Sequence, residues 1–256
     1  MVSQKMSCGC ESTVALRQHV KFFNLNHRNM TNRKRTDLIN TLSKDLQPVS
    51  PRNGIVFPAL LWFIMSWIYV VALSLYLGPL RTGALESLIK SPQFAFESLV
   101  GLISGALFCL IAFQEAIPGR RHQWLVWLAF ISALLWISCY IAGLSFPAIE
   151  PSWDGKRAHC VLEAYLYSGP PLIIGYRLIY QRYPLNSLRA GIFLGMSAGM
   201  LPALFMQISC MYDPRHILTH HIAPISIIVV SGALLGIIFN KRKHIHDFDN
   251  IAHTRH

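Results

Sequence analysis

The chain carries few charged side chains for its length, and acids are the rarer kind. Lys, Arg, Asp and Glu make up 14% of its 256 residues, against about a quarter in an average soluble domain, and only 12 residues are Asp or Glu. Hydrophobic residues reach 53%. This composition excludes a large soluble domain, because most of the chain must contact a solvent other than water. We therefore predict an all-α integral membrane protein.

Signals for several other classes are also missing. The formal net charge is +11, but no run of Lys and Arg has the interleaved aromatic residues of a nucleic-acid surface, so no direct nucleic-acid binding is expected. No nucleophile–His–acid arrangement and no phosphate-binding loop is present, so we predict that the protein is not an enzyme and requires no cofactor. The first long apolar run begins near Phe57, beyond a secretory signal of roughly 15–30 residues, so the first span must direct its own insertion.

Six apolar runs are long enough to cross about 30 Å of hydrocarbon, and they divide the chain into three parts. These parts are a basic tail over 1–56, a bundle of six transmembrane helices over 57–239, and a second basic tail over 240–256. Gly169-Pro170-Pro171 interrupts the fourth run, which also carries Glu163. The predicted spans are Phe57–Leu77, Phe96–Pro118, Trp124–Phe146, His159–Tyr180, Leu188–Met211 and Ile217–Phe239.

Charged and small residues of the spans have structural explanations. Glu97, Glu115 and Arg177 lie near predicted span ends, where placement at the membrane interface explains them without a polar path. Gly191 and Gly195 form a GxxxG pattern in the fifth span. This pattern favours close helix packing inside one bundle over dimerisation, and the oligomeric state stays open.

The distribution of Lys and Arg predicts the orientation. With six spans and a cytoplasmic N-terminus, 18 of the 23 basic residues fall in segments predicted to be cytoplasmic. Cytoplasmic loops of membrane proteins carry such an excess. Both termini are therefore expected in the cytoplasm, in a multi-pass protein whose first partner is the lipid bilayer.

The N-terminal tail contains a short amphipathic segment at about 36–48. Thr36 is a plausible N-cap, and Pro48 and Pro51 end the segment. A helix this short is not stable alone in water, so its apolar stripe needs the bilayer surface, the bundle or another protein as a partner. Upstream, Met30-Thr31-Asn32 resembles a fresh start, and we hypothesise that Met30 is the biological start. The apolar stripe consists of Leu38, Ile39, Leu42 and Leu46, with Asp37 and Asp45 beside it.

Two of the six cysteines stand apart from the others. Cys160 opens the fourth span and Cys210 closes the fifth, so adjacent antiparallel helices would place both at the outer face. Their sulfurs could be buried thiols, a redox pair or ligands of a soft metal, since thiolate and imidazole together suit such ions. Cys8 and Cys10 lie in the tail, and Cys109 and Cys139 lie within spans. The side chains around the outer pair are His159, Glu163, His216, His220 and His221, with His216 and His220 one helical turn apart.

In the order of these features the chain resembles the NrsF-type negative regulators, six-span bacterial anti-sigma factors. The resemblance covers about 30–240 and rests on motifs spread along it. They are Thr36-Asp37-Leu38-Ile39, Leu42, Asp45-Leu46, Pro48-Val49, Pro92, Phe94, Glu97, Pro118-Gly119, Cys160, Cys210, Asp213 and His220.

The resemblance implies a function in the bacterial inner membrane. The tail would hold an extracytoplasmic-function sigma factor through Asp37, Leu38, Ile39, Leu42, Asp45 and Leu46. A periplasmic heavy metal or oxidant would release it. Cys160, Cys210 and His220 would be the sensor, with His159, Glu163 and His216 as auxiliary ligands of a transient metal ion on Cys160 and Cys210. Two alternatives remain open, a small metal or solute transporter and a membrane thiol oxidoreductase.

Overall fold

The chain divides into two units, residues 1–52 and 53–256. Every regular element in the described part of the chain is a helix, and no strand occurs there. Predictions for Cys8, Cys10, Met30, Leu42, Asp45 and Leu46 lie outside the described residues. The computed structural model describes residues 34–41, 43, 54–78, 80–117, 122–182, 184 and 186–253, with 241–253 as backbone only.

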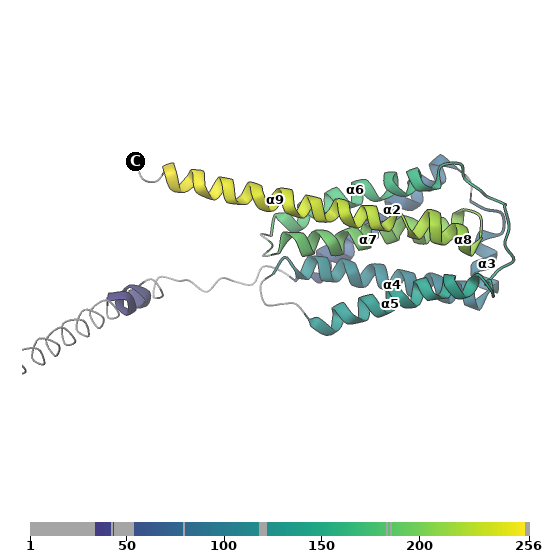
Figure 1. The fold of residues 1–256 in the computed structure, drawn as a ribbon, viewed down its shortest axis with the longest axis horizontal. Coiled ribbons are helices and arrows are strands. Elements are labelled where there is room, and N and C mark those ends of the chain that lie inside the picture. The colour runs from purple at the N-terminus through teal and green to yellow at the C-terminus, as the bar shows by residue number, and fades with distance from the viewer. Residues whose placement is uncertain are drawn as a thin grey trace, which may run out of the picture. The chain divides into compact units, whose positions relative to one another are not determined.

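The second unit is a bundle of long helices that alternate in direction (Figure 1). The short helices lie at the end of the bundle where α6 begins and α7 ends, which is called the cysteine end below. In chain order the elements are α2 (Val56–Leu77), α3 (Ala84–Lys90), α4 (Pro92–Gln114), α5 (Gln123–Gly143), α6 (Cys160–Tyr180), α7 (Ser187–Ser209), α8 (Pro214–His216), the π-helix η1 (Ile217–Ile222) and α9 (Ile225–His253).

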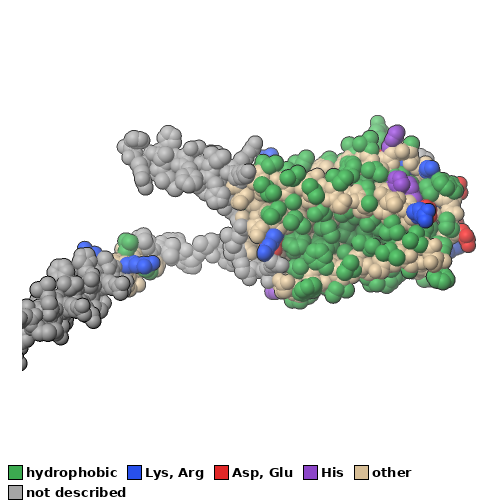
Figure 2. All heavy atoms as spheres, viewed as in Figure 1, with side chains coloured by type: hydrophobic (Ala, Val, Ile, Leu, Met, Phe, Trp, Pro, Cys, Tyr) green, Lys and Arg blue, Asp and Glu red, His purple; other side chains and the backbone are tan. Residues whose placement is uncertain are grey.

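Five helical stretches are long and apolar enough to cross a membrane, where six spans were predicted. They are α2, α4, α5, α7 and the continuous run of α8, η1 and α9 over Pro214–Asn240. Large apolar side chains such as Ile64, Ile131 and Val230 are exposed on them, and hydrophobic atoms cover the visible flank of the bundle in Figure 2. An apolar flank of this kind fits contact with lipid rather than water.

The fourth predicted span is present as α6 but is not among the five. Glu163, Arg177 and the run Ser168-Gly169-Pro170-Pro171 lower its hydropathy. The prolines do not interrupt the helix, which is continuous over Cys160–Tyr180. A side chain of α2 compensates for one proline amide that cannot donate. The Tyr69 hydroxyl donates at 3.3 Å to the Leu166 carbonyl, which Pro170 leaves without its helix donor. The Trp62 indole also joins α2 to this part of α6 by donating to the Pro171 carbonyl at 3.0 Å.

Helix α7 is the centre of the bundle because its small side chains allow other backbones to approach. About 83% of its most apolar window is buried, against 28–50% for the other four candidate spans. A Cβ atom added at Gly191 would lie 2.1 Å from the Gly232 carbonyl oxygen of α9, and one at Gly195 would lie 2.8 Å from Val229 Cα. The predicted glycine pattern therefore packs within the chain, α7 against α9.

Glu97, near the start of α4, is buried inside the bundle. Ser91 caps α4 and Pro92 opens it, so the helix begins four residues before the predicted Phe96 and carries Glu97 inward by one turn. Its carboxylate accepts hydrogen bonds from Tyr212 and Gln93, each at 3.3 Å. Burial of an acid inside the bundle requires such donors, and no sequence pattern predicted them.

In the first unit, residues 34–41 are helical. Thr36 therefore lies inside the helix and is not its N-cap, contrary to the prediction. Leu38 is 60% exposed and Ile39 is 54% exposed. Within this unit the predicted apolar stripe thus has its first two members free for a partner.

Candidate functional site

The two outer cysteines of the sequence prediction lie side by side at the cysteine end of the bundle. Cys160 is the first residue of α6, and Cys210 caps the C-terminus of α7. Because α6 and α7 are antiparallel neighbours, the two sulfurs come within 3.4 Å of each other. Both side chains are buried and both thiols are free.

Two histidines complete a cluster around these sulfurs. His216 Nε2 is 3.8 Å from Cys210 Sγ. One ligand atom each from Cys160, Cys210, His216 and His221 lies within 4.8 Å of every other. We call these four residues the sulfur–imidazole cluster.

The π-helix η1 brings His221 to the cluster. Its wider turn is visible in the hydrogen bond from the Ala223 amide to the Leu218 carbonyl, five residues back. Pro224 has no amide proton to donate to the His220 carbonyl, which favours this loosening of the helix. In the widened turn His221, five residues after His216, meets the ring of His216 edge-on at 5.0 Å between centroids.

His220 is not part of the cluster, although it was predicted as a sensor residue. It is exposed, its ring stacks on that of His216, and its Nδ1 lies 2.7 Å from the Thr219 hydroxyl. The family resemblance implied His220 as a sensor residue, and its spacing of four from His216 suggested that both share a face, as they would in a regular α-helix. The π-helix shifts that face to His221, and the only local signal for it is Pro224.

His159 and Glu163 also lie outside the cluster. His159 is exposed. The carboxylate of Glu163 accepts from the guanidinium of Arg157 at 3.0 Å and from the Tyr167 hydroxyl at 3.2 Å. Because these two hydrogen bonds hold the carboxylate in place, the geometry does not support its predicted role as an auxiliary ligand.

Arg157 connects the cysteine end of α6 to the end of α2. Its guanidinium donates to the carbonyls of Ser74 at 3.2 Å and Gly78 at 3.1 Å, in addition to Glu163. The Ser74 carbonyl, in the last turn of α2, also accepts from the amide of the C-cap Gly78 at 3.1 Å, so Arg157 adds a donor at this helix end. The backbone carbonyl oxygen of Arg157 lies 3.3 Å from Cys160 Sγ. One residue thus touches both a cluster sulfur and the helix that continues from the N-terminal tail.

The electrostatics of the cluster favour a thiolate at Cys210. A hydrogen bond from Cys160 lowers the pKa of the Cys210 thiol, and His216 and His221 act in the same direction, while burial opposes them. A thiolate beside a thiol and two imidazoles is a reactive set, suited either to oxidation of the sulfur pair or to coordination of a soft cation.

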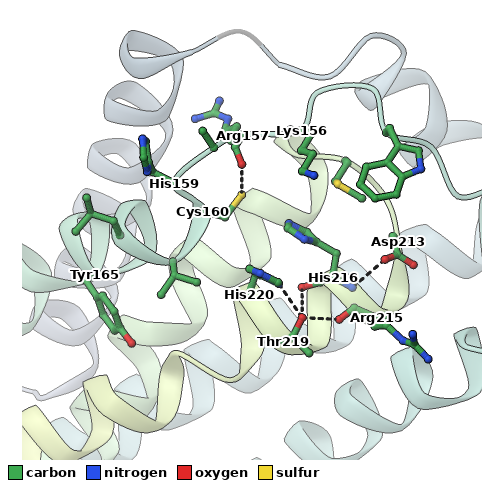
Figure 3. A pocket seen from close by; sticks show the side chains of 15 residues that line it. Lys156, Arg157, His159, Cys160, Tyr165, Asp213, Arg215, His216, Thr219 and His220 are labelled. Atoms are coloured by element: carbon green, nitrogen blue, oxygen red, sulfur yellow. Dashed lines mark hydrogen bonds between the residues drawn. The ribbon is translucent and has the colours of Figure 1, made fainter.

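An open pocket of about 760 Å³ leads to the cluster. Cys160 and His216 form part of its wall (Figure 3), whereas Cys210 and His221 do not line it. Lys156 and Arg215 stand on the same wall. The pocket gives a small reagent or ion a path to one sulfur and one imidazole of the cluster.

Comparison with protein families gives one match. The family model described as NrsF, negative regulator of sigma F, matches residues 42–240. The match covers the whole bundle and the cluster but begins after Asp37, Leu38 and Ile39. No curated protein and no solved structure matches the chain.

Proposed function

The chain belongs to the NrsF family of negative regulators of sigma F, and from this we propose that it is a membrane-bound anti-sigma factor whose cluster of cysteines receives the signal. In the resting state the cytoplasmic tail holds an extracytoplasmic-function sigma factor away from RNA polymerase. An oxidant or a soft metal ion acting at Cys160 and Cys210 releases it. The 3.4 Å approach of these two sulfurs is the observation that carries the signalling part of the proposal.

The proposal needs the cysteine end and the tail on opposite sides of the membrane. Helices α2 and α7 both begin at the end of the bundle opposite to the cysteine end (Figure 1). If α6 crosses together with the five apolar helices, the basic segments 177–189 and 240–256 lie on the cytoplasmic side, in agreement with the excess of Lys and Arg there. The cluster then faces the periplasm of the bacterial inner membrane, an oxidising compartment.

Helix α6 can cross because its polar groups have partners. Arg157, which precedes its first turn, neutralises Glu163, and α2 donates to the Leu166 carbonyl that Pro170 frees and to the Pro171 carbonyl. Irregular or polar segments are tolerated in a membrane where neighbouring helices satisfy them. An impermeant thiol reagent tests this orientation. In intact cells it should label a cysteine introduced at exposed Asp154, and should spare one introduced at exposed Asn40. The reverse pattern would contradict the proposed topology.

The tail is expected to bind the sigma factor through its exposed apolar stripe. Leu38→Asp together with Ile39→Asp should reduce capture of the sigma factor encoded beside the gene at least tenfold, because both side chains are exposed and apolar. Asn40→Ala, an exposed position in the same helix, is the matched control. Pull-down with the full-length protein in detergent measures the effect. Equal capture by the double variant and the wild type would exclude this segment as the contact.

The two cluster sulfurs are expected to form a disulfide under mild oxidation. Diamide would accept two electrons and two protons from the thiols of Cys160 and Cys210, which become one S–S bond as diamide is reduced to the hydrazine. The bond needs the sulfurs to approach from 3.4 Å to about 2.05 Å, a small movement. Protection of two thiols from alkylation, read by intact mass, measures it.

The cross-linking test has clear controls. Cys160→Ser and Cys210→Ser should each abolish the protection, and each should also abolish induction by the stress signal while sigma capture persists. Cys139→Ser, a partly buried thiol of α5, should change neither result. Normal induction in both cluster variants would overturn the assignment of the sensor.

A further inference from the structure

We infer that Cys160, Cys210, His216 and His221 form a four-ligand site for a tetrahedral divalent cation of the Zn²⁺ class. The inference deepens the proposed function, because it names the ligand set and the chemistry of the same cluster. It replaces the predicted set, in which His220 stood beside the cysteines.

The distances within the cluster fit tetrahedral coordination. With Zn–S bonds of about 2.3 Å and Zn–N bonds of about 2.0–2.1 Å, ligand atoms around one Zn²⁺ lie roughly 3.3–3.8 Å apart. Cys160 Sγ and Cys210 Sγ are 3.4 Å apart, and Cys210 Sγ and His216 Nε2 are 3.8 Å apart. All four ligand atoms lie within 4.8 Å of one another, so small side-chain rotations would close the set.

His221 gives an independent indication of a ligand. Its side chain is 1% exposed, and neither ring nitrogen has a hydrogen-bond partner among the described residues. Buried imidazoles normally have a partner for at least one nitrogen. A cation bound between the sulfurs would supply that partner.

The chemistry and the access route are consistent with the same cation. Two thiolates and two neutral imidazoles leave a site with a dication uncharged, which suits its burial. Cys160 and His216 line the open pocket, so the cation can meet one ligand of each kind before it passes inward. The basic side chains Lys156 and Arg215 on the pocket wall repel a cation. The negative charge that the thiols gain when they release their protons offsets this repulsion.

Cobalt binding tests the site directly. The full-length protein in detergent, reduced and freed of metal, is titrated with Co²⁺ and then with Zn²⁺. We expect one Co²⁺ per chain, with the near-ultraviolet band of thiolate-to-cobalt charge transfer and the intense visible bands of a tetrahedral centre, all lost on addition of Zn²⁺. Absence of these bands from the wild-type protein would overturn the inference.

Adjacent histidines supply the matched variants. His221→Ala should weaken Co²⁺ binding on the order of 100-fold or more, since even outer partners of ligands contribute 10–100-fold. His216→Ala, at a partly exposed position, should weaken it similarly and does not depend on the tolerance of a buried site to truncation. His220→Ala should bind as the wild type does. Wild-type affinity in His216→Ala, or an equal loss in His220→Ala, would contradict this ligand set.

The same preparations separate the inference from the proposed function. If the protein captures the sigma factor but binds no Co²⁺, the metal site is refuted and the anti-sigma function stands. If it binds one Co²⁺ per chain but captures no sigma factor, the anti-sigma function is refuted and the metal site stands.

Discussion

Gly191→Ala is expected to force α7 and α9 apart and to lower the stability of the whole bundle. The new Cβ would lie 2.1 Å from the carbonyl oxygen of Gly232, and a backbone atom cannot turn aside as a side chain can. The approach is mutual, since a Cβ at Gly232 would lie 2.2 Å from the carbonyl oxygen of Gly191. Overpacking of this kind costs about 1–3 kcal/mol or more. Thermal unfolding of the protein in detergent, followed by size-exclusion chromatography, measures the loss.

Gly169→Ala is the matched control and should change stability far less. Gly169 also lies in a long helix, α6, but a Cβ there meets nothing within 4 Å beyond its chain neighbours. Alanine favours a helix over glycine by up to about 1 kcal/mol, which offsets the crowding of its Cβ against the ring of Pro170, so this variant should unfold close to the wild-type temperature. If both variants behaved alike, close contact between α7 and α9 would not be what fixes the glycine at 191.

Arg157→Ala is expected to disconnect the cluster from α2 and to destabilise the cysteine end. The side chain of Arg157 is 9% exposed and that of Glu163 is 17% exposed, so removal of the guanidinium leaves a nearly buried carboxylate without its ion pair. Breaking a buried pair from one side costs about 3–5 kcal/mol, and partial exposure of Glu163 places this case toward the lower figure. The carbonyls of Ser74 and Gly78 lose a donor at the same time.

The effect of Arg157→Ala on release of the sigma factor distinguishes a signalling role of Arg157 from a purely structural one. Helix α2 leads from the N-terminal tail to Arg157, and the carbonyl of Arg157 contacts Cys160 Sγ. We expect Arg157→Ala to form the Cys160–Cys210 disulfide with diamide but to release at least tenfold less sigma factor. Arg157→Lys should recover only part of the response, because one ammonium cannot reproduce the planar set of donors.

Lys156→Ala serves as the control for this experiment. Lys156 is exposed, and its ammonium lies 4.5 Å from the centre of the Trp153 ring. The variant removes a neighbouring positive charge without touching α2, and both disulfide formation and sigma release should remain normal. Normal release by Arg157→Ala, in protein shown to be folded, would place the route to the tail elsewhere.

The long helices were predictable because length and apolarity are local properties. Five of the predicted runs correspond to helices able to cross a membrane, and the fourth is a helix of 21 residues. Its prolines suggested a break, since the residue pattern alone cannot show that Tyr69 of another helix donates to the carbonyl freed by Pro170, or that Trp62 donates to the Pro171 carbonyl. The start of α4 was placed too late, because Ser91 and Pro92 begin the helix before its apolar run begins.

Some features of the site were also predictable from the sequence, and others were not. That Cys160 and Cys210 share one end of the bundle follows from counting alternating helices, and their closeness follows from α6 and α7 being neighbours. His221 could not be separated from His220 by spacing, because the choice depends on a π-helix that changes the phase of one turn. The roles of Arg157 and Glu97 depend on partners 79 and 115 positions away, which no local pattern encodes.

By itself, the sequence determined that this is a helical protein with apolar helices long enough to cross a membrane and with two cysteines at one end of its bundle, since hydrophobic runs and their order fix both. Only the tertiary structure decided which imidazole faces the sulfurs, which acid is buried and which arginine reaches α2. Those contacts are set by helix phase and by side chains that meet across the bundle. Both depend on how all the helices pack, and no single segment contains that information.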